Sequence, residues 1–283
     1  MQSKVFSTNK TLNIRGTLWD LSTPKVMGIL NVTPDSFYDG GRYEEEKSII
    51  GKVEKMLSEG ADLIDVGGYS TRPGAAEILE AEEQKRVVDA IRIILNAFPQ
   101  VVLSIDTFRS GVARAAVEAG ASLINDISGG ELDQKMFETV AALQVPYVLM
   151  HLRGTPQTMT QLTQYDNLIK NITDYFHRKL ESLHRLGVKD ILIDPGFGFA
   201  KTVEQNFELL NHLDYLQILG KPILVGLSRK SMIWRTLETN AEGALNGSTA
   251  LHTLALLKGA GILRVHDVKE AVECIRLIGR LEK

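Results

Sequence analysis

The chain has little cysteine, little net charge and no long apolar run. Its 283 residues contain one cysteine, Cys274, which excludes an internal disulfide and a structural zinc cluster, and we expect it in the core. A net charge of −3 gives no electrostatic footprint for nucleic acid or an anionic membrane. A membrane-spanning helix would need about 20 consecutive apolar residues, and no such run occurs. Residues 1–10 also lack the apolar stretch of a signal peptide, so we expect a cytoplasmic protein.

Proline is also scarce, with 8 residues, and no repeat or linker rich in proline and glycine divides the chain. Hydrophobic residues make up 44% of the sequence and charged residues 24%, which is enough for a sizeable core. A chain of 283 residues fits two modest domains or one α/β barrel of roughly 250 residues. The missing linker favours a single domain over residues 1–283, with a short N-terminal extension at about 1–24.

Short runs rich in valine, isoleucine and leucine recur eight times, each followed by polar or glycine residues. They are residues 26–30, 63–66, 101–105, 123–124, 147–150, 191–193, 223–225 and 262–265. Continuous apolar runs are typical of parallel strands that are covered on both faces. Residues 82–97, 165–186 and 268–281 space their apolar side chains as amphipathic helices do. The pattern predicts an α/β protein with a (β/α)₈ TIM barrel.

The competing architecture is an open, doubly wound sheet, which usually has a glycine-rich dinucleotide turn after its first strand. Here residues 31–35 read NVTPD. In a barrel, catalytic groups project from the carboxyl ends of the strands. Functional groups follow nearly every predicted strand: Asn31, the loop 67–72, Asp106, Asn125, His151, Asp194, residues 228–230, Arg264 and His266. One Asp or Asn after a strand often caps a helix, but this recurrence favours a site.

The types of these residues suggest what they bind. Asp106, Asn125 and Asp194 offer carboxylates and an amide, which suit a flat heterocycle with a guanidine-like edge. Arg264 and His266 alternate on the last strand, near the usual phosphate site of a barrel. The RVHD segment alone fits two interpretations equally well. In one, Arg264 pairs with a structural carboxylate and His266 caps the following helix; in the other, both residues bind an oxyanion. Their position favours the oxyanion site. Histidines and carboxylates with transition-metal spacing are missing, so we expect no tightly held zinc.

Residues 226–231 (GLSRKS) place a hydroxyl and two cations after the seventh strand, where they either bind an anion or form a solvated loop. No Gly-x₄-Gly-Lys-Ser/Thr pattern occurs, so nucleoside triphosphate hydrolysis is not supported. Residues 31–43 and 67–76 are candidate lids. We expect surface or packing roles for four histidines: His177, His184, His212 and His252. His151 receives no role.

Seven motifs in order along the chain together resemble the dihydropteroate synthase family. They are 28–37 (GILNVTPDSF), 65–68 (DVGG) with 70–74 (STRPG), 104–107 (SIDT), 125–130 (NDISGG), 194–199 (DPGFGF), 228–231 (SRKS) and 264–267 (RVHD). The resemblance implies a Mg²⁺-dependent transferase that condenses 6-hydroxymethyl-7,8-dihydropterin pyrophosphate with p-aminobenzoate. The products are 7,8-dihydropteroate and pyrophosphate, in folate biosynthesis. It also implies a homodimer, sulfonamide inhibitors and a dissociative route in which pyrophosphate leaves first.

The resemblance also implies roles for single residues. The pterin is held by Asp106, Asn125, Asp194 and Lys230, with Ile127 and Met150 in the pocket wall. The pyrophosphate is held by Asn31, Arg264 and His266, and Asn31 is also the Mg²⁺ ligand. The p-aminobenzoate is held by Phe37, Thr71, Pro73, Phe199, Ser228 and Lys230. Asp106 and Lys230 are the catalytic candidates, because a transient pterin cation needs a nearby negative charge.

Departures from the usual family pattern are Tyr38, Ala200 and residues 152–153, and none of them removes an assigned group. Two other functions stay open. Pterin-binding barrels that pass a methyl group to a corrinoid protein share the pterin pocket, but they do not usually combine the STRP and SRK segments. An inactive pterin-binding barrel is the non-enzymatic alternative, since a fold does not determine a function.

Overall fold

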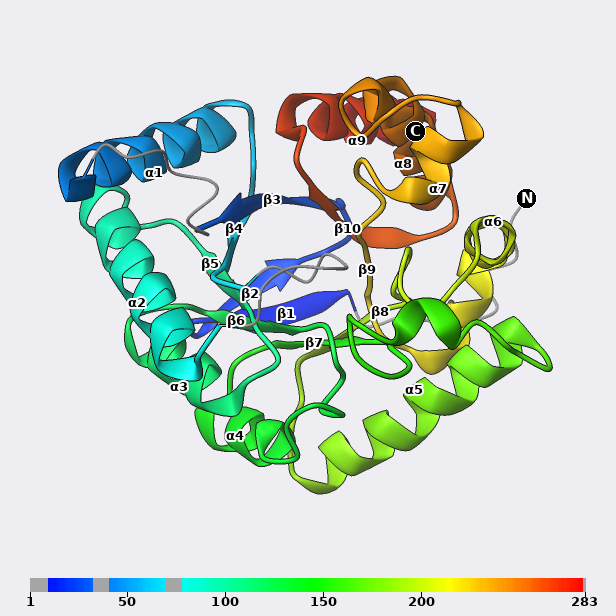
Figure 1. The fold of residues 1–283 in the computed structure, drawn as a ribbon, viewed down its shortest axis with the longest axis horizontal. Coiled ribbons are helices and arrows are strands. Elements are labelled where there is room, and N and C mark those ends of the chain that lie inside the picture. Colours follow the sequence, from blue (N-terminus) through cyan, green and yellow to red (C-terminus); the bar gives the residue numbers. More distant parts are fainter. Residues whose placement is uncertain (1–9, 33–40, 70–77, 282–283) are drawn as a thin grey trace.

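The computed structural model describes residues 10–32, 41–69 and 78–281. A closed barrel of eight parallel strands forms its centre, in the spatial order β10-β3-β4-β5-β6-β7-β8-β9. Helices surround the barrel on its outside (Figure 1). The predicted (β/α)₈ barrel is confirmed, and the open doubly wound sheet is excluded because the two edge strands of such a sheet would not pair.

The barrel strands follow the predicted apolar runs closely. They are β3 (Lys25–Asn31), β4 (Leu63–Gly67), β5 (Leu103–Asp106), β6 (Leu123–Asp126), β7 (Tyr147–Met150), β8 (Ile191–Asp194), β9 (Ile223–Val225) and β10 (Ala260–Val265). Several strands extend beyond the apolar run to include the first polar residue, as at Asp106 and Asp194. These polar residues are therefore held by sheet hydrogen bonds and do not lie on free loops.

Helices connect the strands in the described ranges. They are α1 (Gly41–Ser58), α2 (Glu80–Ala97), α3 (Ser110–Glu118), α4 (Met136–Leu143), α5 (Leu168–Arg185), α6 (Val203–Asn211), α7 (Ser231–Thr236), α8 (Leu245–Leu257) and α9 (Val268–Leu281), with 3₁₀ turns η2 (Met159–Gln161), η3 (Leu213–Leu219) and η4 (Glu242–Ala244). The predicted segment 268–281 coincides with α9. Among the described helices, none combines the length and apolar character needed to cross a bilayer.

Two kinds of residue fill the barrel interior in layers. Near the amino ends of the strands, Leu63, Leu123 and Ile262 belong to a buried apolar cluster. Two residues further along the same strands stand Asp65, Asn125 and Arg264. Because side chains two apart on a strand point to the same face, these polar residues also point inward, one layer nearer the carboxyl ends. The packed lower layer supports a polar upper layer.

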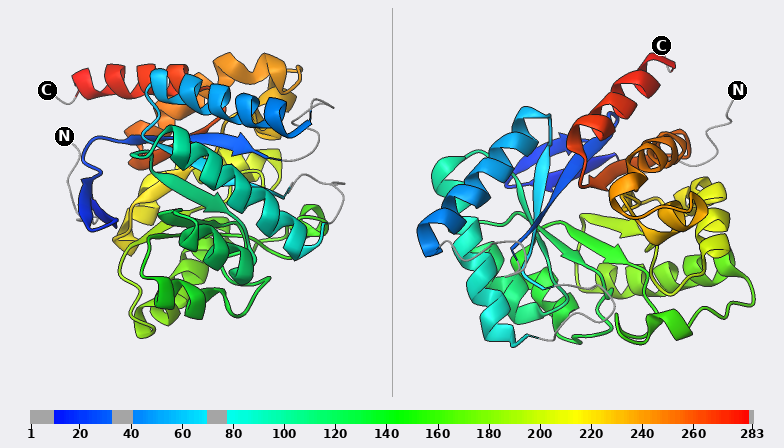
Figure 2. Two further views of the ribbon diagram at one scale, coloured as in Figure 1. Left: turned by 90° about the vertical axis from the view of Figure 1, so that its left-hand side faces the viewer. Right: turned by 45° about the horizontal axis from the view of Figure 1, so that its top comes forward.

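An antiparallel hairpin closes the amino end of the barrel. It consists of β1 (Thr11–Ile14) and β2 (Thr17–Asp20), and it lies at one end of the barrel in Figure 2. Leu12 and Ile14 are buried in the apolar cluster of the lower barrel layer. Arg15 and Gly16 form the turn with φ values of 50° and 81°, which is the backbone of a type I′ hairpin. Because the hairpin covers the amino end, the described residues leave the carboxyl end of the barrel for a substrate.

Candidate active site

One register row across four strands carries the first functional residues. Asn31 pairs with Gly67, Gly67 with Asp106, and Asp106 with Asn125. A Cβ at Gly67 would come 3.4 Å from Oδ1 of Asn31 and 3.6 Å from Cβ of Asp106. The missing side chain thus leaves a gap between two functional groups. On the opposite side of the barrel, Met150 pairs with Asp194.

Arg264 joins the carboxylates of this mouth into one network. Its Nε donates to Oδ2 of Asp65 at 2.6 Å, and its Nη2 donates to Oδ2 of Asp106 at 2.5 Å. The amide of Asn125 donates to the same Oδ2 of Asp65 at 2.8 Å. Asp65 is fully buried, and its Oδ1 has no hydrogen-bond partner among the described residues. The sequence allowed a structural ion pair for Arg264, and the structure contains such pairs. One of the two carboxylates, however, is the candidate catalytic Asp106.

The acidity of the carboxylates is set mainly by burial. Burial raises the pKa of Asp106 to about 7; the Arg264 charge opposes the rise, and the Asp65 charge adds to it. Burial likewise raises the pKa of Asp194, against the attraction of Lys230. A carboxyl with a pKa near 7 changes its charge around neutral pH, so Asp106 is sensitive to any cation that arrives or leaves beside it.

Lys230, in the segment that follows β9, faces the carboxylates of the barrel mouth. Its Nζ donates to the carbonyl oxygen of Phe197 and lies 4.3 Å from the ring centroid of Phe199. Burial lowers the pKa of Lys230 to about 8, while the Asp194 charge acts in the opposite direction. The ammonium therefore lies against an aromatic face and within electrostatic reach of the Asp194 carboxylate, an arrangement that can hold a flat substrate.

The neighbouring Arg229 is turned away from the site, which corrects part of the sequence interpretation. Its Nε and Nη2 donate to the two carboxylate oxygens of Asp267, at 2.8 and 2.7 Å. Only one of the two predicted cations therefore faces the barrel mouth. Ser228 is buried, and its hydroxyl lies 3.1 Å from Nδ1 of His266 while accepting from the His266 backbone N–H. The side chain of His266 itself is exposed.

The predicted apolar wall comes together in one small cluster above the barrel. Ile127 and Met150 are buried in it, and Phe199 and Phe108 pack against it. Asp126, which sequence reasoning passed over, supports this wall from behind. It accepts from Tyr147 Oη at 2.6 Å, from the Ser128 hydroxyl and backbone N–H at 2.7 Å, and from the Gly130 N–H at 2.8 Å. These bonds fix the loop that carries Ile127.

Two further buried groups lie behind the site and were not assigned from the sequence. Nζ of Lys201 lies 3.2 Å from Nδ1 of His151, and both side chains are buried. His151 follows strand β7 as predicted, but it points to this lysine. Nothing in the local sequence signals the contact, because it joins residues 50 positions apart. Asp65 was visible only as part of a motif, and its role depends on Arg264, 199 positions away.

Comparison with known proteins agrees with this arrangement. The family model described as "Pterin binding enzyme" matches residues 27–266. The dihydropteroate synthase of Escherichia coli strain K12 is 42% identical over 266 residues, which cover 93% of this chain and 94% of the relative. The crystal structure of the Yersinia pestis dihydropteroate synthase with a sulfonamide drug has a TM-score of 0.90 at 43% identity, covering 96% of this chain and 99% of that one. The chain belongs to the dihydropteroate synthase family.

A second solved structure of the family contains a bound small molecule. The Xanthomonas albilineans dihydropteroate synthase solved with 4-aminobenzoic acid has a TM-score of 0.89 at 39% identity, covering 97% of this chain and 99% of that one. Here, the candidate side chains from Asn31 to His266 all fall within the matched range 27–266. Three residues that the dihydropteroate synthase resemblance assigned to p-aminobenzoate, Phe37, Thr71 and Pro73, lie outside the described residues, as does most of both predicted lids.

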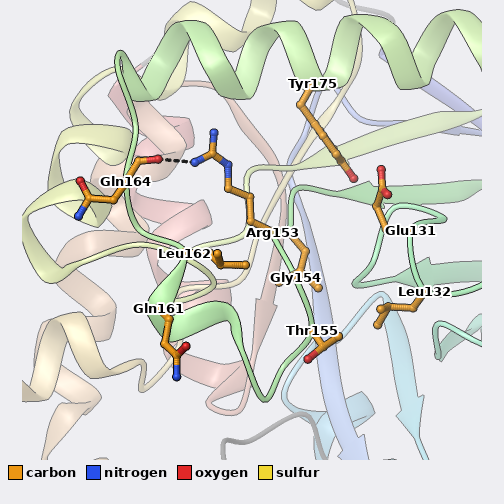
Figure 3. Close-up of a pocket in the computed structure, with 10 residues that line it drawn as sticks. Glu131, Leu132, Arg153, Gly154, Thr155, Gln161, Leu162, Gln164 and Tyr175 are labelled. Atoms are coloured by element: carbon orange, nitrogen blue, oxygen red, sulfur yellow. Dashed lines mark hydrogen bonds between the residues drawn. The ribbon is translucent and has the colours of Figure 1, made fainter.

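A cavity of about 660 Å³ lies beside the candidate site of this dihydropteroate synthase fold (Figure 3). It is lined by the segments after β6 and β7, including Glu131, Arg153 and Thr155, and by Tyr175 of α5. Arg153 is held there by a hydrogen bond to the carbonyl of Gln164. The carboxylates and the lysine of the barrel mouth do not line this cavity, so it does not account for the chemistry.

Proposed function

We propose that this chain condenses 6-hydroxymethyl-7,8-dihydropterin pyrophosphate with p-aminobenzoate to give 7,8-dihydropteroate and pyrophosphate. The observation that carries the proposal is the network of Asp106, Arg264, Asp65 and Asn125 at the open end of the barrel. In this network the Arg264 guanidinium, a cation suited to an oxyanion, adjoins carboxylates and an amide that suit the polar edge of a heterocycle. Membership in the dihydropteroate synthase family supports the same reaction.

The pterin occupies the upper layer of the barrel in this proposal. Asp106, Asn125 and Asp194 accept from or donate to its ring edge, because inward-facing carboxylates and an amide match a guanidine-like pattern. The buried side chains of Ile127 and Met150 cover the ring face. The protein thereby removes the heterocycle from water while pairing its polar edge.

The pyrophosphate lies toward β10 and β3. Arg264 and His266 bind its oxygens, and the pyrophosphate competes with Asp106 for the guanidinium of Arg264. The loss of that pairing leaves the carboxylate of Asp106 beside the pterin. Arg264 holds the pKa of Asp106 down before this exchange, and the developing pterin cation then takes its place as the neighbouring positive charge, so Asp106 stays ionised beside the cation.

Mg²⁺ fits Asn31 by donor chemistry. Oδ1 of Asn31 is an amide oxygen at the mouth, beside the gap that Gly67 leaves. The described residues contain no cluster of three or more His, Cys, Asp or Glu that could hold a metal ion, which suits a cation that takes one or two protein oxygens and completes its shell with phosphate and water. When bound, Mg²⁺ would neutralise charge on the departing pyrophosphate.

The chemical step then needs no covalent enzyme intermediate. The bond between the pterin methylene carbon and the pyrophosphate oxygen breaks with its electron pair on the oxygen, and Asp106 stabilises the remaining cation. The amine lone pair of p-aminobenzoate forms the new C–N bond, and the resulting ammonium releases its proton to solvent or to the departing pyrophosphate. Phe199, Ser228 and Lys230 hold the aromatic acid, with the Lys230 ammonium over the Phe199 ring.

We include a homodimer and a cytoplasmic location in the proposal. Exposed leucines on two adjacent helices, Leu254 and Leu257 of α8 and Leu277 of α9, offer an apolar surface for a second copy. Light scattering should give twice the chain mass, and a monomer at all concentrations would contradict the dimer.

The decisive test of the reaction is pyrophosphate release. The purified protein is incubated with dihydropterin pyrophosphate and Mg²⁺, with and without p-aminobenzoate. We expect steady release that depends on the amine and is inhibited by a sulfonamide. Pterin binding without release would favour the inactive binder. Methyl transfer in a separate incubation with a methylated folate and a corrinoid protein would favour the methyltransferase.

A further inference from the structure

Lys201 is a buried lysine whose ammonium is matched by three acceptors. Nζ lies 3.0 Å from the carbonyl oxygen of Gly196, 3.0 Å from that of Phe199 and 3.2 Å from Nδ1 of His151. The residue is 9% exposed, and lysine is almost never buried to this extent without specific partners. Three N–H donors directed at three acceptors leave no donor unpaired.

The segment that Lys201 holds has an unusual backbone. Gly196, Gly198 and Ala200 all have left-handed φ values, of 71°, 79° and 48°. Such a conformation is costly for Ala200, which has a Cβ. A side chain at Gly196 would overlap the carbonyl oxygen of His151, so the segment packs tightly against the end of β7. A strained segment of this kind persists only when its surroundings fix it.

Lys201 holds this segment from the side away from the candidate active site. We call its contacts with the Gly196 and Phe199 carbonyls and with His151 Nδ1 the Lys201 clasp. Lys201 bonds the carbonyls of residues 196 and 199, which are also joined by the turn bond from the Phe199 N–H to the Gly196 carbonyl at 3.1 Å. Beyond the clasp, Tyr165 Oη donates to the Ala200 carbonyl at 2.9 Å, and the capping box of α6 begins at Thr202. The carboxyl end of the segment therefore has further anchors of its own.

The front of the same segment forms part of the candidate active site. The Phe197 carbonyl accepts from Lys230, and the Phe199 ring lies under the Lys230 ammonium. The carbonyl that Lys201 holds and the ring that faces Lys230 both belong to Phe199. A shift of the Phe199 backbone that breaks the bond to Lys201 is therefore expected to displace the ring as well.

We propose that Lys201, together with His151, is a positioning residue that sets Phe199 and Lys230 for p-aminobenzoate without touching either substrate. This inference rests on the proposed function, because it names the amine as the substrate that these two residues hold. It assigns His151 a role as the acceptor that completes the clasp. Asp106 and Asn125 of the pterin side belong to other strands and are not held by Lys201. Asp194 accepts from the Gly196 N–H at 2.8 Å, so it is the pterin residue that adjoins the segment held by Lys201.

Lys201 and His151 can keep their hydrogen bonds whether the Lys201 amine is charged or neutral. Burial lowers the pKa of Lys201 to about 7, opposed by Asp194 and reinforced by Lys230 and Arg153. Burial also lowers the pKa of His151 well below its ordinary value, so this ring stays neutral. A neutral amine donates to the two carbonyls and accepts from an Nδ1–H of the other histidine tautomer. Arginine lacks this option because it stays charged and planar.

The test is a comparison of KM values for the two substrates. Lys201→Met keeps the length of the side chain and removes its donors. We expect the KM for p-aminobenzoate to rise between about tenfold and a hundredfold, because displaced contacts lose binding on that scale. The KM for the pterin pyrophosphate should rise clearly less than this, because Asp106 and Asn125 stay in place while Lys230 and Asp194 are the pterin residues near the clasp. Lys55→Met, at an exposed lysine of α1, is the matched control.

A second pair of variants keeps the proposal testable when Lys201→Met does not fold. His151→Asn places an amide oxygen near the position of Nδ1 and should retain a KM for p-aminobenzoate close to that of the wild type. His151→Leu removes the acceptor and should raise this KM selectively. Equal rises in both KM values, or a loss of thermal stability with unchanged KM values, would overturn the positioning role.

Failure of the proposed function is seen separately. Wild-type protein without turnover would overturn the proposed reaction, and the positioning role would then be decided by a crystal structure of Lys201→Met. There we expect the Phe199 ring to have moved from the Lys230 ammonium. An unmoved ring would overturn the inference whatever the activity.

Discussion

Removal of the Arg264 side chain should destabilise the protein by an amount that depends on pH. The guanidinium is 19% exposed and serves two carboxylates, Asp65 and Asp106. Removing one partner of a buried ion pair typically costs about 3–5 kcal/mol, because a buried charge is left without its counterion. Arg264→Met keeps much of the side-chain volume, so the loss reports the charge more than a cavity.

The pH dependence follows from Asp106. Its pKa in the folded chain, about 7, lies above the ordinary value of 3.8. The stability it contributes is therefore full below the ordinary pKa and is lost as the pH rises through 7. Arg264 lowers this pKa, so the variant should have a higher one. Above pH 7 the free energy of unfolding of the wild type no longer falls with pH. That of the variant continues to fall by roughly 1.4 kcal/mol per pH unit.

Urea unfolding, monitored by circular dichroism, measures the free energy of unfolding of the wild type and of the variant at each pH. We expect the stability difference between wild type and Arg264→Met to be about 2 kcal/mol larger at about pH 8.5 than at about pH 6. Arg276→Met, at an exposed arginine of α9, controls for the loss of a positive charge. An equal difference at both pH values would refute the coupling between Arg264 and Asp106. The KM for the pterin pyrophosphate should also rise in Arg264→Met.

Three further substitutions test other parts of the site. Asp106→Asn should lower kcat more than it weakens pterin binding, because the pterin cation loses its counter-charge; steady-state kinetics with an unchanged kcat would contradict this role. Asp65→Asn should move the acidic limb of the kcat/KM profile to lower pH, since the Asp65 charge raises the pKa of Asp106; an unmoved limb would separate the two carboxylates. Gly196→Ala should lower the unfolding free energy by at least about 1–2 kcal/mol, from the left-handed backbone and the overlap with His151, and a thermal melt equal to wild type would contradict that geometry.

The barrel could be predicted because its strands are continuous apolar runs. The predicted strands at residues 147–150 and 223–225 coincide with β7 and β9. At β5 and β8 the prediction stops at the last apolar residue, Ile105 or Ile193, whereas backbone pairing continues through Asp106 and Asp194. Apolar patterning reports burial, and functional residues at strand ends interrupt that pattern without interrupting the strand.

The polar contacts behind the site could not be predicted in this way. The direction of Arg229 is decided by a carboxylate 38 positions later, and the clasp of Lys201 joins residues on two different loops. The amino-terminal hairpin also went unpredicted, because its turn is Arg15–Gly16 in place of the usual Asn–Gly. Long-range side-chain pairing has no periodic signature in the sequence.

The central claim is that the open end of this barrel joins a pterin to an aromatic amine, and product analysis tests it most directly. Wild-type protein, dihydropterin pyrophosphate, p-aminobenzoate and Mg²⁺ are incubated together, and 7,8-dihydropteroate and pyrophosphate are quantified by mass spectrometry and a coupled assay. We predict equal amounts of both products over many turnovers, with no steady turnover when the amine is omitted. Pyrophosphate without dihydropteroate, or no product from a protein shown to bind the pterin, would contradict the claim.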